Sequence, residues 1–589
     1  MNMDRRNRIA QWAFDTRSIL GRFHLWLEDV EIEYHGRQEN DDLSFAGGSL
    51  ERAFVVAAAV TALGTRLFGR WGEGAGLDKA GINRVKKDAD AVSAYALSEA
   101  LWYLTRSLPE NHAVMVSLGE GLMPKAGETP EMGSNPLLGF GRVYARPQVA
   151  RFLDRRVHRL VNDPAYEWSE FWQDLQVAGI TVWGAAVDTL ENTSRFAKGS
   201  PTGAMTIVHL FDQPLKVARP YEGYMGNLVL PRRVVEKAAE RSILIDYRTP
   251  RAKVMEAIRD TYPGIVPEHV HVWTLGGKSR RQRLSALWDE WQALGAHVVE
   301  DGWTLPDTRY PIFTESGTYA PVFRVGEFTD EAGAPHLFIC DGYAASAEAM
   351  QAASLDPILD LSTSMCLFSS RFEASADRER ELIALDPDAE EFPSRLAATI
   401  GAELTPELVD AYRESLRSAR AALMPVHRRT ITADDFFPLK DWRVLALAGY
   451  MLPDPYCDRD GVEKAADDIY RVTTRAATRR GMIDVTLSLR LMDPMDEMRM
   501  VFSPLLDRFY AGQDYRIRPV KISDSGRIRN ELQTLCSEAI EYRPDDHMVV
   551  HFDQVDDAVL EPDKKQLIQE VLHWYKREHP LWFEWLELE

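Results

Sequence analysis

Cysteine is scarce in this sequence, and the cysteines that occur lie far apart. They are Cys340, Cys366, Cys457 and Cys536, and no two of them form a CxxC pair. Zinc sites built from cysteines and disulfide frameworks both depend on clustered cysteines. The spacing therefore indicates neither, and a reducing cytoplasm is the expected location.

A long apolar run is missing as well. The longest, Ala53–Leu63, has about eleven residues, whereas a helix that spans a membrane needs roughly 20. The first residues, MNMDRRNRIAQWAF, lack an apolar stretch leading to a small-residue cleavage site, so we expect no secretory signal. The sequence predicts a soluble protein without a membrane partner.

Positive charge is in deficit. Lysine and arginine total 69 against 90 for aspartate and glutamate, which gives a formal net charge of -21. Such a balance opposes binding to nucleic acid or to anionic membranes. The hydrophobic fraction of 45% is that of an ordinary globular protein, and 589 residues exceed what one hydrophobic core usually organises. We therefore expect a folded protein of several domains that does not bind nucleic acid.

Apolar periodicity predicts a mixed α/β protein that begins with an amphipathic helix over 5–34. The acidic stretch 371–435 is expected to be helical, without strands, and a Trp-rich helix is expected at the C-terminus. Further helices are expected at Leu50–Leu67, Asp88–Leu104, Arg251–Thr261, Arg281–Leu294 and Ser346–Ala353. Strands are expected at Ala113–Leu118, Ile180–Val187, Met205–Phe211, near Ile243, and at His269–Leu275, His297–Val299, His336–Cys340, Trp442–Ala448, Ile483–Arg490 and Met548–Phe552.

Acidic residues recur where the expected strands end or the expected helices begin. Loops at the carboxyl ends of strands are where an α/β sheet gathers ligand-binding side chains. Any single acid there has an ordinary explanation, because the first turn of a helix favours negative charge. The D-x-x-E-x-T spacing is more informative, since one turn can present two carboxylates and a hydroxyl. The acids are Asp90, Glu120, Asp188, Glu191 and Glu348, and the hydroxyl belongs to Thr193.

The order of these motifs resembles class II fructose-1,6-bisphosphatase, a member of the lithium-sensitive phosphatase superfamily that includes the inositol monophosphatases. The resemblance covers roughly 48–505. Its strongest segments are GEG, VDTLENTSRFAKGSPTGAMTIVHLFD, EGYMGNLVLP, VHVWTLGGKSRRQRLSALWDEWQALGAHVVEDG, HLFICDGYAASAEAMQAA and VLALAGYMLPD. It implies a layered α/β/α/β/α sugar-phosphatase fold with a helical insertion at 371–435 and a small α/β C-terminal module. The implied divisions are 1–46, 47–240, 241–505 and 506–589.

The same resemblance implies a role for individual residues. The family's metal ligands fall on Asp90, Glu120, Asp188, Glu191 and Glu348, and the expected ions are Mg²⁺ or Mn²⁺, which prefer carboxylate oxygens. Thr193 is expected to position the attacking water, with Asp188 or Glu191 helping to remove its proton. Substrate contacts fall on Tyr224, Ser194 and the basic loop that contains Lys278, Arg280 and Arg281.

Three departures from the family pattern affect these expectations. Asn192 replaces a glycine in the metal turn, and asparagine tolerates the left-handed backbone that glycine provides there. Leu122 replaces a second acid after Glu120, with Glu128 or Glu131 as possible substitutes. The spacing from Asp90 to Glu120 is also long, which leaves Asp88 as an alternative ligand.

The expected function is therefore metal-dependent hydrolysis of a sugar phosphate, of the fructose-1,6-bisphosphatase type used in gluconeogenesis, by a homo-oligomer. Two alternatives stay open: a catalytically impaired protein that binds a phosphorylated metabolite, and a phosphatase for inositol or nucleotide-derived phosphates. His269 and His271 lie two residues apart on one strand face and could ligate a transition metal, although an ordinary strand is the commoner meaning of such spacing.

Overall fold

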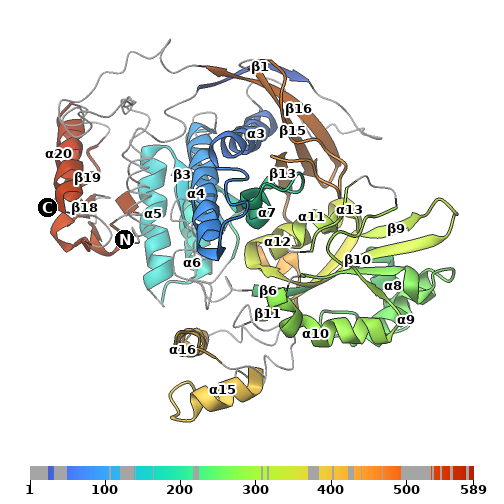
Figure 1. The fold of residues 1–589 in the computed structure, drawn as a ribbon. Coiled ribbons are helices and arrows are strands. Elements are labelled where there is room, and N and C mark those ends of the chain that lie inside the picture. Colours follow the sequence, from blue (N-terminus) through green and yellow to red (C-terminus); the bar gives the residue numbers. More distant parts are fainter. Residues whose placement is uncertain are drawn as a thin grey trace.

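The computed structural model describes residues 24–31, 49–119, 138–216, 224–368, 382–421, 430–492 and 529–588, apart from short gaps inside these stretches. Helices and strands alternate through this part of the chain, and the α/β class expected from the sequence is confirmed (Figure 1). None of the helices described is both long enough and apolar enough to cross a membrane.

A nine-stranded sheet holds most of the strands from the first and last thirds of the fold. Its order is β1-β16-β15-β13-β5-β4-β2-β3, with β14 added at β15. Helices α3 (Leu50–Phe68) and α4 (Lys79–Leu104) pack against this sheet, and their apolar residues form a shared core with it. The strands are β1 (His24–Glu31), β2 (His112–Leu118), β3 (Val143–Ala145), β4 (Thr181–Glu191), β5 (Met205–Phe211), β13 (Val444–Tyr450), β14 (Val462–Lys464), β15 (Ile469–Thr478) and β16 (Gly481–Met492).

A seven-stranded sheet forms the second half of the core, in the order β12-β11-β6-β10-β7-β8 with β9 beside β10. Helix α12 (Ser346–Ser354) contacts β4 of the first sheet and β6, β10 and β11 of the second, so it lies between the two sheets. The strands are β6 (Tyr224–Pro231), β7 (Val270–Trp273), β8 (His297–Val298), β9 (Gly326–Thr329), β10 (Pro335–Ala345), β11 (Leu361–Phe368) and β12 (Thr430–Ile431). Helices α8 (Arg232–Glu240), α9 (Arg251–Thr261), α10 (Lys278–Ala293), α11 (Tyr319–Val322) and α13 (Asp356–Leu359) complete this half.

Smaller groups of elements surround these sheets. Helices α5 (Pro147–Asn162) and α6 (Trp168–Ala178) pack at the β3 side of the large sheet, and α7 (Thr193–Lys198) contacts α4. The pair α15 (Phe392–Ile400) and α16 (Pro406–Ala421) has its own apolar core and lies apart from the sheets (Figure 1). The C-terminal module joins α20 (Pro562–Glu578) to a sheet of β17 (Ile540–Tyr542), β18 (Met548–Val550) and β19 (Leu586–Leu588).

The helix predicted over 5–34 is wrong for its C-terminal part. His24–Glu31 is strand β1, which pairs antiparallel with β16 at the edge of the large sheet. Residues 1–23 lie outside the described residues. The sequence HLWLEDVE fits both a helix and a strand, and only the partner strand, more than 450 residues later in the chain, decides between them.

Other predicted elements also need correction. The strand near Ile243 is wrong: Ser242 has a φ of 61°, and Ile243 packs against the core from a loop. The stretch 371–435 contains α15 and α16 but also the short strand β12. The helix predicted near the C-terminus is confirmed as α20, but it ends at Glu578, and Leu586–Leu588 form strand β19, parallel to β18. The predicted domain divisions stay a prediction.

A buried ion pair anchors the seven-stranded sheet. The guanidinium of Arg251, at the start of α9, donates to both carboxylate oxygens of Asp341 on β10, at 2.6 and 2.8 Å. Trp291 Nε1 donates to the same carboxylate at 2.7 Å, and Arg251 also donates to the backbone carbonyl of Tyr247. Both charges are almost fully buried. Each of the two charged groups therefore needs the other as its partner, because water cannot reach the site to replace a lost one.

Replacing Arg251 with methionine tests this anchor. We expect Arg251→Met to lower the free energy of unfolding by about 3–5 kcal/mol, because it leaves Asp341 charged and buried without its cation. Arg443→Met is the matched control, since the Arg443 side chain is 81% exposed and pairs with Asp212 at the surface. The control should change stability by about 0–1 kcal/mol. Urea denaturation measures both, and equal effects would contradict the assignment.

Candidate metal centre

The candidate site begins at an irregularity in β4. Asp188 pairs with Ile207 of β5, but the next pairing joins Glu191 to Met205, so three steps along β4 match two steps along β5. Side chains alternate between the two faces of a strand, which would send residues three apart to opposite faces. The extra residue in this β-bulge places the side chains of both acids on the same face of the strand. Asp188 Oδ1 accepts a hydrogen bond from the Leu190 backbone N–H at 3.1 Å inside the bulge.

Neighbouring side chains hold the bulge in place. Thr206 Oγ1 donates to the backbone carbonyl of Thr189 at 3.1 Å, and the hydroxyls of Thr189 and Ser93 lie 2.7 Å apart. The strand predicted to end at Val187 therefore runs four residues further, and both acids belong to β4 instead of the turn after it. The structure thus presents the D-x-x-E pair from a rigid strand.

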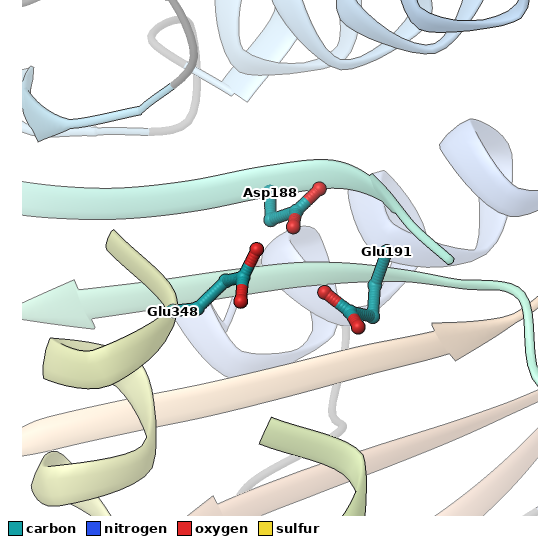
Figure 2. A group of neighbouring side chains, drawn as sticks. All are labelled: Asp188, Glu191 and Glu348. Carbon is teal, nitrogen blue, oxygen red and sulfur yellow. The ribbon is translucent and has the colours of Figure 1, made fainter. Parts of the chain in front are cut away.

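Glu348 reaches the same place from the second half of the chain. It lies in the first turn of α12, directly after β10, as the sequence predicted. Figure 2 shows its carboxylate turned toward those of Asp188 and Glu191. One carboxylate oxygen from each residue lies within 4.8 Å of the others. The exposed fractions are 6% for Asp188 and 2% for Glu191.

This closeness is electrostatically unfavourable without a cation. Burial raises the pKa of Glu191 well above its ordinary value, and the charges of Glu348 and Asp188 raise it further. The backbone N–H of Gly317 donates to Glu191 Oε1 at 3.2 Å and offsets only part of this effect. Three like charges in a buried space favour either protonation or a bound cation.

Gly317 is a site residue that sequence reasoning missed. A Cβ atom at this position would lie 1.6 Å from Glu348 Oε2, inside the volume of the carboxylate. The backbone therefore approaches two of the acids more closely than any other residue type allows. No motif marks this glycine in the sequence, because its role depends on a loop about 30 residues before Glu348 that meets α12 in space.

The turn after Glu191 follows the expectation. Asn192 has a φ of 67° and a ψ of 38°, the left-handed conformation predicted for it, and its Nδ2 donates to the Gly203 carbonyl at 2.7 Å. Thr193 is the first residue of α7, and its hydroxyl donates to the Leu190 carbonyl at 3.0 Å. Its oxygen lone pairs are therefore oriented to accept a hydrogen bond from another group. Ser194 follows in α7 and is half-buried.

Asp90 has a different place from the one predicted. It lies in the interior of α4, which begins at Lys79 and not at Asp88, and it is not one of the three converging carboxylates. The Ser93 hydroxyl donates to the Asp90 carbonyl and contacts Thr189, so this part of α4 borders the bulge. The alternative Asp88 forms an ion pair with Arg70.

For several predicted site residues, the structure describes only the backbone or does not describe the residue. Glu120, Leu122, Glu128 and Glu131 lie outside the described residues. Tyr224 is the first residue of β6, and its side chain is also outside the description. The predicted basic loop is helical: Lys278, Arg280 and Arg281 form the first turn of α10, just after β7.

The three carboxylates suit a hard divalent cation. Mg²⁺ and Mn²⁺ bind oxygen ligands at about 2.0–2.2 Å, and Mg²⁺ commonly takes one or two carboxylates together with water and phosphate oxygens. Asp188, Glu191 and Glu348 offer oxygen ligands alone and carry the charge that such an ion would neutralise. The donor set therefore fits Mg²⁺ or Mn²⁺ better than a metal that prefers sulfur or nitrogen.

Neutralising one acid should stabilise the protein when no metal is present. The unfolded chain loses the Glu191 proton near pH 4.5, before the folded protein does, so folded stability falls as the pH rises from there toward the raised pKa. We expect Glu191→Gln to be more stable than the wild type by about 1–3 kcal/mol at pH 8 in EDTA. Mg²⁺ should then stabilise the wild type and leave the variant nearly unchanged.

Thermal unfolding at pH 5 and pH 8, with EDTA or with Mg²⁺, measures these differences. Glu110→Gln is the control, because its side chain is 87% exposed and pairs with Arg146 at the surface. A wild type more stable than Glu191→Gln in EDTA at pH 8 would show that the three acids do not repel one another.

Compared with models of known protein families and with curated protein sequences, the chain has no significant match. The family resemblance inferred from the order of motifs therefore stays a prediction. The chemistry of the site has to be judged from its own side chains.

Proposed function

We propose that the protein is a metal-dependent phosphatase that hydrolyses a sugar phosphate, with Mg²⁺ or Mn²⁺ at Asp188, Glu191 and Glu348. The observation that carries this proposal is the convergence of three carboxylates from strand β4 and helix α12, two of them almost fully buried (Figure 2). A bound cation would compensate the charge of this cluster and keep all three acids ionised. Bound divalent metal would supply Lewis acidity, activating water and stabilising negative charge on phosphoryl oxygens.

The groups around the carboxylates fit the steps of phosphate hydrolysis. The hydroxyl of Thr193 donates its hydrogen bond to the Leu190 carbonyl. Its oxygen can therefore accept a hydrogen bond from the attacking water and orient that water. Asp188 or Glu191 takes the proton from that water as it attacks. Both acids are fixed by the bulge and by the Gly317 N–H, so little reorganisation accompanies the reaction.

A second phosphate has a natural place at the start of α10. The N-terminus of a helix favours anions, and the first turn of α10 contains Lys278, Arg280 and Arg281. Gly276, just before this helix, donates its N–H to the Thr314 carbonyl. Thr314 is three residues from Gly317, which is at most about 10 Å of extended chain. This hydrogen bond links the segment before α10 to the segment that leads to Gly317.

The arrangement of helices and sheets supports the finer fold proposal. We infer a layered α/β/α/β/α sugar-phosphatase fold, with α3 and α4 outside the first sheet, α12 between the sheets, and α8 to α10 beside the second sheet. The motif order in the sequence agrees with this inference. A role in fructose-1,6-bisphosphate hydrolysis rests on both.

Phosphate release from a panel of sugar monophosphates and bisphosphates, with Mg²⁺ or Mn²⁺, tests the proposal. We expect Asp188→Asn to lower kcat by about 10²-fold or more, because it removes a ligand charge and a candidate base. Glu110→Gln should keep wild-type activity. Wild-type protein that binds a sugar phosphate without releasing phosphate would contradict the enzyme assignment and indicate a metabolite-binding protein instead. Preference for inositol or nucleotide-derived phosphates would overturn the substrate class.

Gly317→Ala tests whether close backbone approach shapes the centre. The added methyl group would occupy the present position of Glu348 Oε2, so this carboxylate has to turn away. We expect the Mg²⁺ concentration for half-maximal activity to rise about tenfold, or about 1.4 kcal/mol, while the unfolding midpoint changes little. Gly264→Ala is the control, because a Cβ there makes only an ordinary contact with Pro335. Equal Mg²⁺ requirements in the two variants would contradict the role of Gly317.

A further inference from the structure

Four histidines gather at the edge of the seven-stranded sheet, separate from the carboxylate centre. His271 on β7 and His297 on the edge strand β8 are paired residues of neighbouring parallel strands. His336 lies on the adjacent strand β10, and its ring stacks on that of His269 with centroids 3.9 Å apart. The edge strand leaves His297 half-buried, whereas His271 and His336 are buried.

Hydrogen bonds connect these rings into a chain. His297 Nδ1 and His271 Nδ1 lie 2.7 Å apart, and His271 Nε2 and His336 Nδ1 lie 2.8 Å apart. This series of hydrogen-bonded rings ends at Asp330, whose Oδ2 is 3.4 Å from His336 Nε2. A carboxylate accepts, so His336 donates through Nε2–H and accepts at Nδ1, and His271 in turn donates through Nε2–H. These bonds leave His271 Nδ1 as an unprotonated nitrogen that faces His297.

Aromatic side chains hold the rings in position. Trp303 lies 4.7 Å from the His271 ring and 4.9 Å from the His297 ring, measured between centroids. Phe328 stacks nearly parallel to the His336 ring. The rings therefore keep one orientation, which lowers the entropy lost when a ligand joins two of them.

We propose that His271 and His297 form a binding site for a divalent transition-metal ion such as Cu²⁺, Ni²⁺ or Zn²⁺, with His336 and Asp330 as orienting partners. Imidazole nitrogen is a preferred ligand of these ions. Two nitrogens bound tetrahedrally at about 2.0–2.1 Å from one metal lie about 3.3 Å apart. The 2.7 Å between the two Nδ1 atoms needs to grow by only about 0.6 Å, a small rotation of the half-buried His297 ring.

The proton balance is simple. Without metal, His297 Nδ1–H donates to His271 Nδ1. On binding, the metal replaces this shared proton, which moves through solvent to His297 Nε2, so both rings stay neutral. Neutral rings are also the resting state, since burial lowers the pKa of His271 to about 3 and lowers that of His297. The chain His271, His336, Asp330 then matches the arrangement in which a carboxylate orients a ligand histidine through hydrogen bonds.

The two candidate centres differ in chemistry and in position. The first offers carboxylate oxygens between the sheets, and the second offers imidazole nitrogens at a sheet edge. Hard ions such as Mg²⁺ prefer the first, and late transition metals prefer the second. Strand β7, which carries His271, also leads directly into α10 and its basic first turn.

Titration of the untagged full-length chain with Cu²⁺, followed by electron paramagnetic resonance, tests the proposal. The chain carries Asp188→Asn and Glu191→Gln, so that the carboxylate centre does not compete for the ion. We expect one tightly bound Cu²⁺ whose spectrum shows coupling to two imidazole nitrogens. His297→Ala should weaken binding at least tenfold and remove one nitrogen, and Asp330→Asn should weaken it about tenfold and keep both.

His551→Ala is the control, because His551 belongs to the C-terminal module and contacts Glu541 there. It should bind Cu²⁺ as its parent does. Equal affinity in the parent and His297→Ala, or a spectrum without imidazole nitrogen, would overturn the proposal. The result does not depend on phosphatase activity, since two of the three acids of the carboxylate centre are replaced in the tested chain.

Discussion

The mutual repulsion of three carboxylates is the constraint on which the rest of this structure depends. Asp188 and Glu191 come from one sheet, and Glu348 comes from the helix between that sheet and the other. Burial strengthens the repulsion, because little water remains to screen it. The packing of α12 against both sheets holds the acids together, with apolar residues from both halves joined in one core.

The local features around the acids serve this arrangement. The bulge in β4 turns two acids to one side, the left-handed Asn192 ends the strand immediately afterward, and Gly317 leaves room for Glu348. Each feature is unfavourable or neutral by itself. Together they bring one oxygen of each acid within 4.8 Å of the others, and a metal bound as proposed would offset the electrostatic cost of bringing them together.

The sequence predicted a good part of this site. Asp188, Glu191 and Glu348 were identified by motif order, and the backbone of Asn192 was predicted from the conformations that asparagine tolerates. The bulge was not predictable, because it depends on register with β5, and Gly317 was missed because its contacts are all distant in sequence. Asp90 was assigned to a helix start, but α4 begins eleven residues earlier, since nothing in KAGINRVKK stops a helix.

The same holds for the fold: elements marked by a local sequence pattern were predicted, and elements fixed by contacts with distant residues were not. Strands with continuous apolar runs, such as β4 and β5, were found from the sequence, although β4 extends further than its apolar part. Strands β6, β11 and β15 were not predicted, and each has at least two partner strands, so tertiary pairing decides its conformation. The histidine chain has the same origin: only His269 and His271 are close in sequence, and the sheet supplies His297 and His336.

The position of Glu348 has a consequence for synthesis of the protein on the ribosome. The residue numbers 191 and 348 differ by 157, so the nascent chain exposes the first two acids long before the third. At about 5–20 residues per second, the interval is about 8–30 s. During that time β4 and β5 can pair, but α12 has not emerged to bring the third carboxylate to the other two. A metal bound as proposed would therefore load late, after both halves of the core have left the exit tunnel.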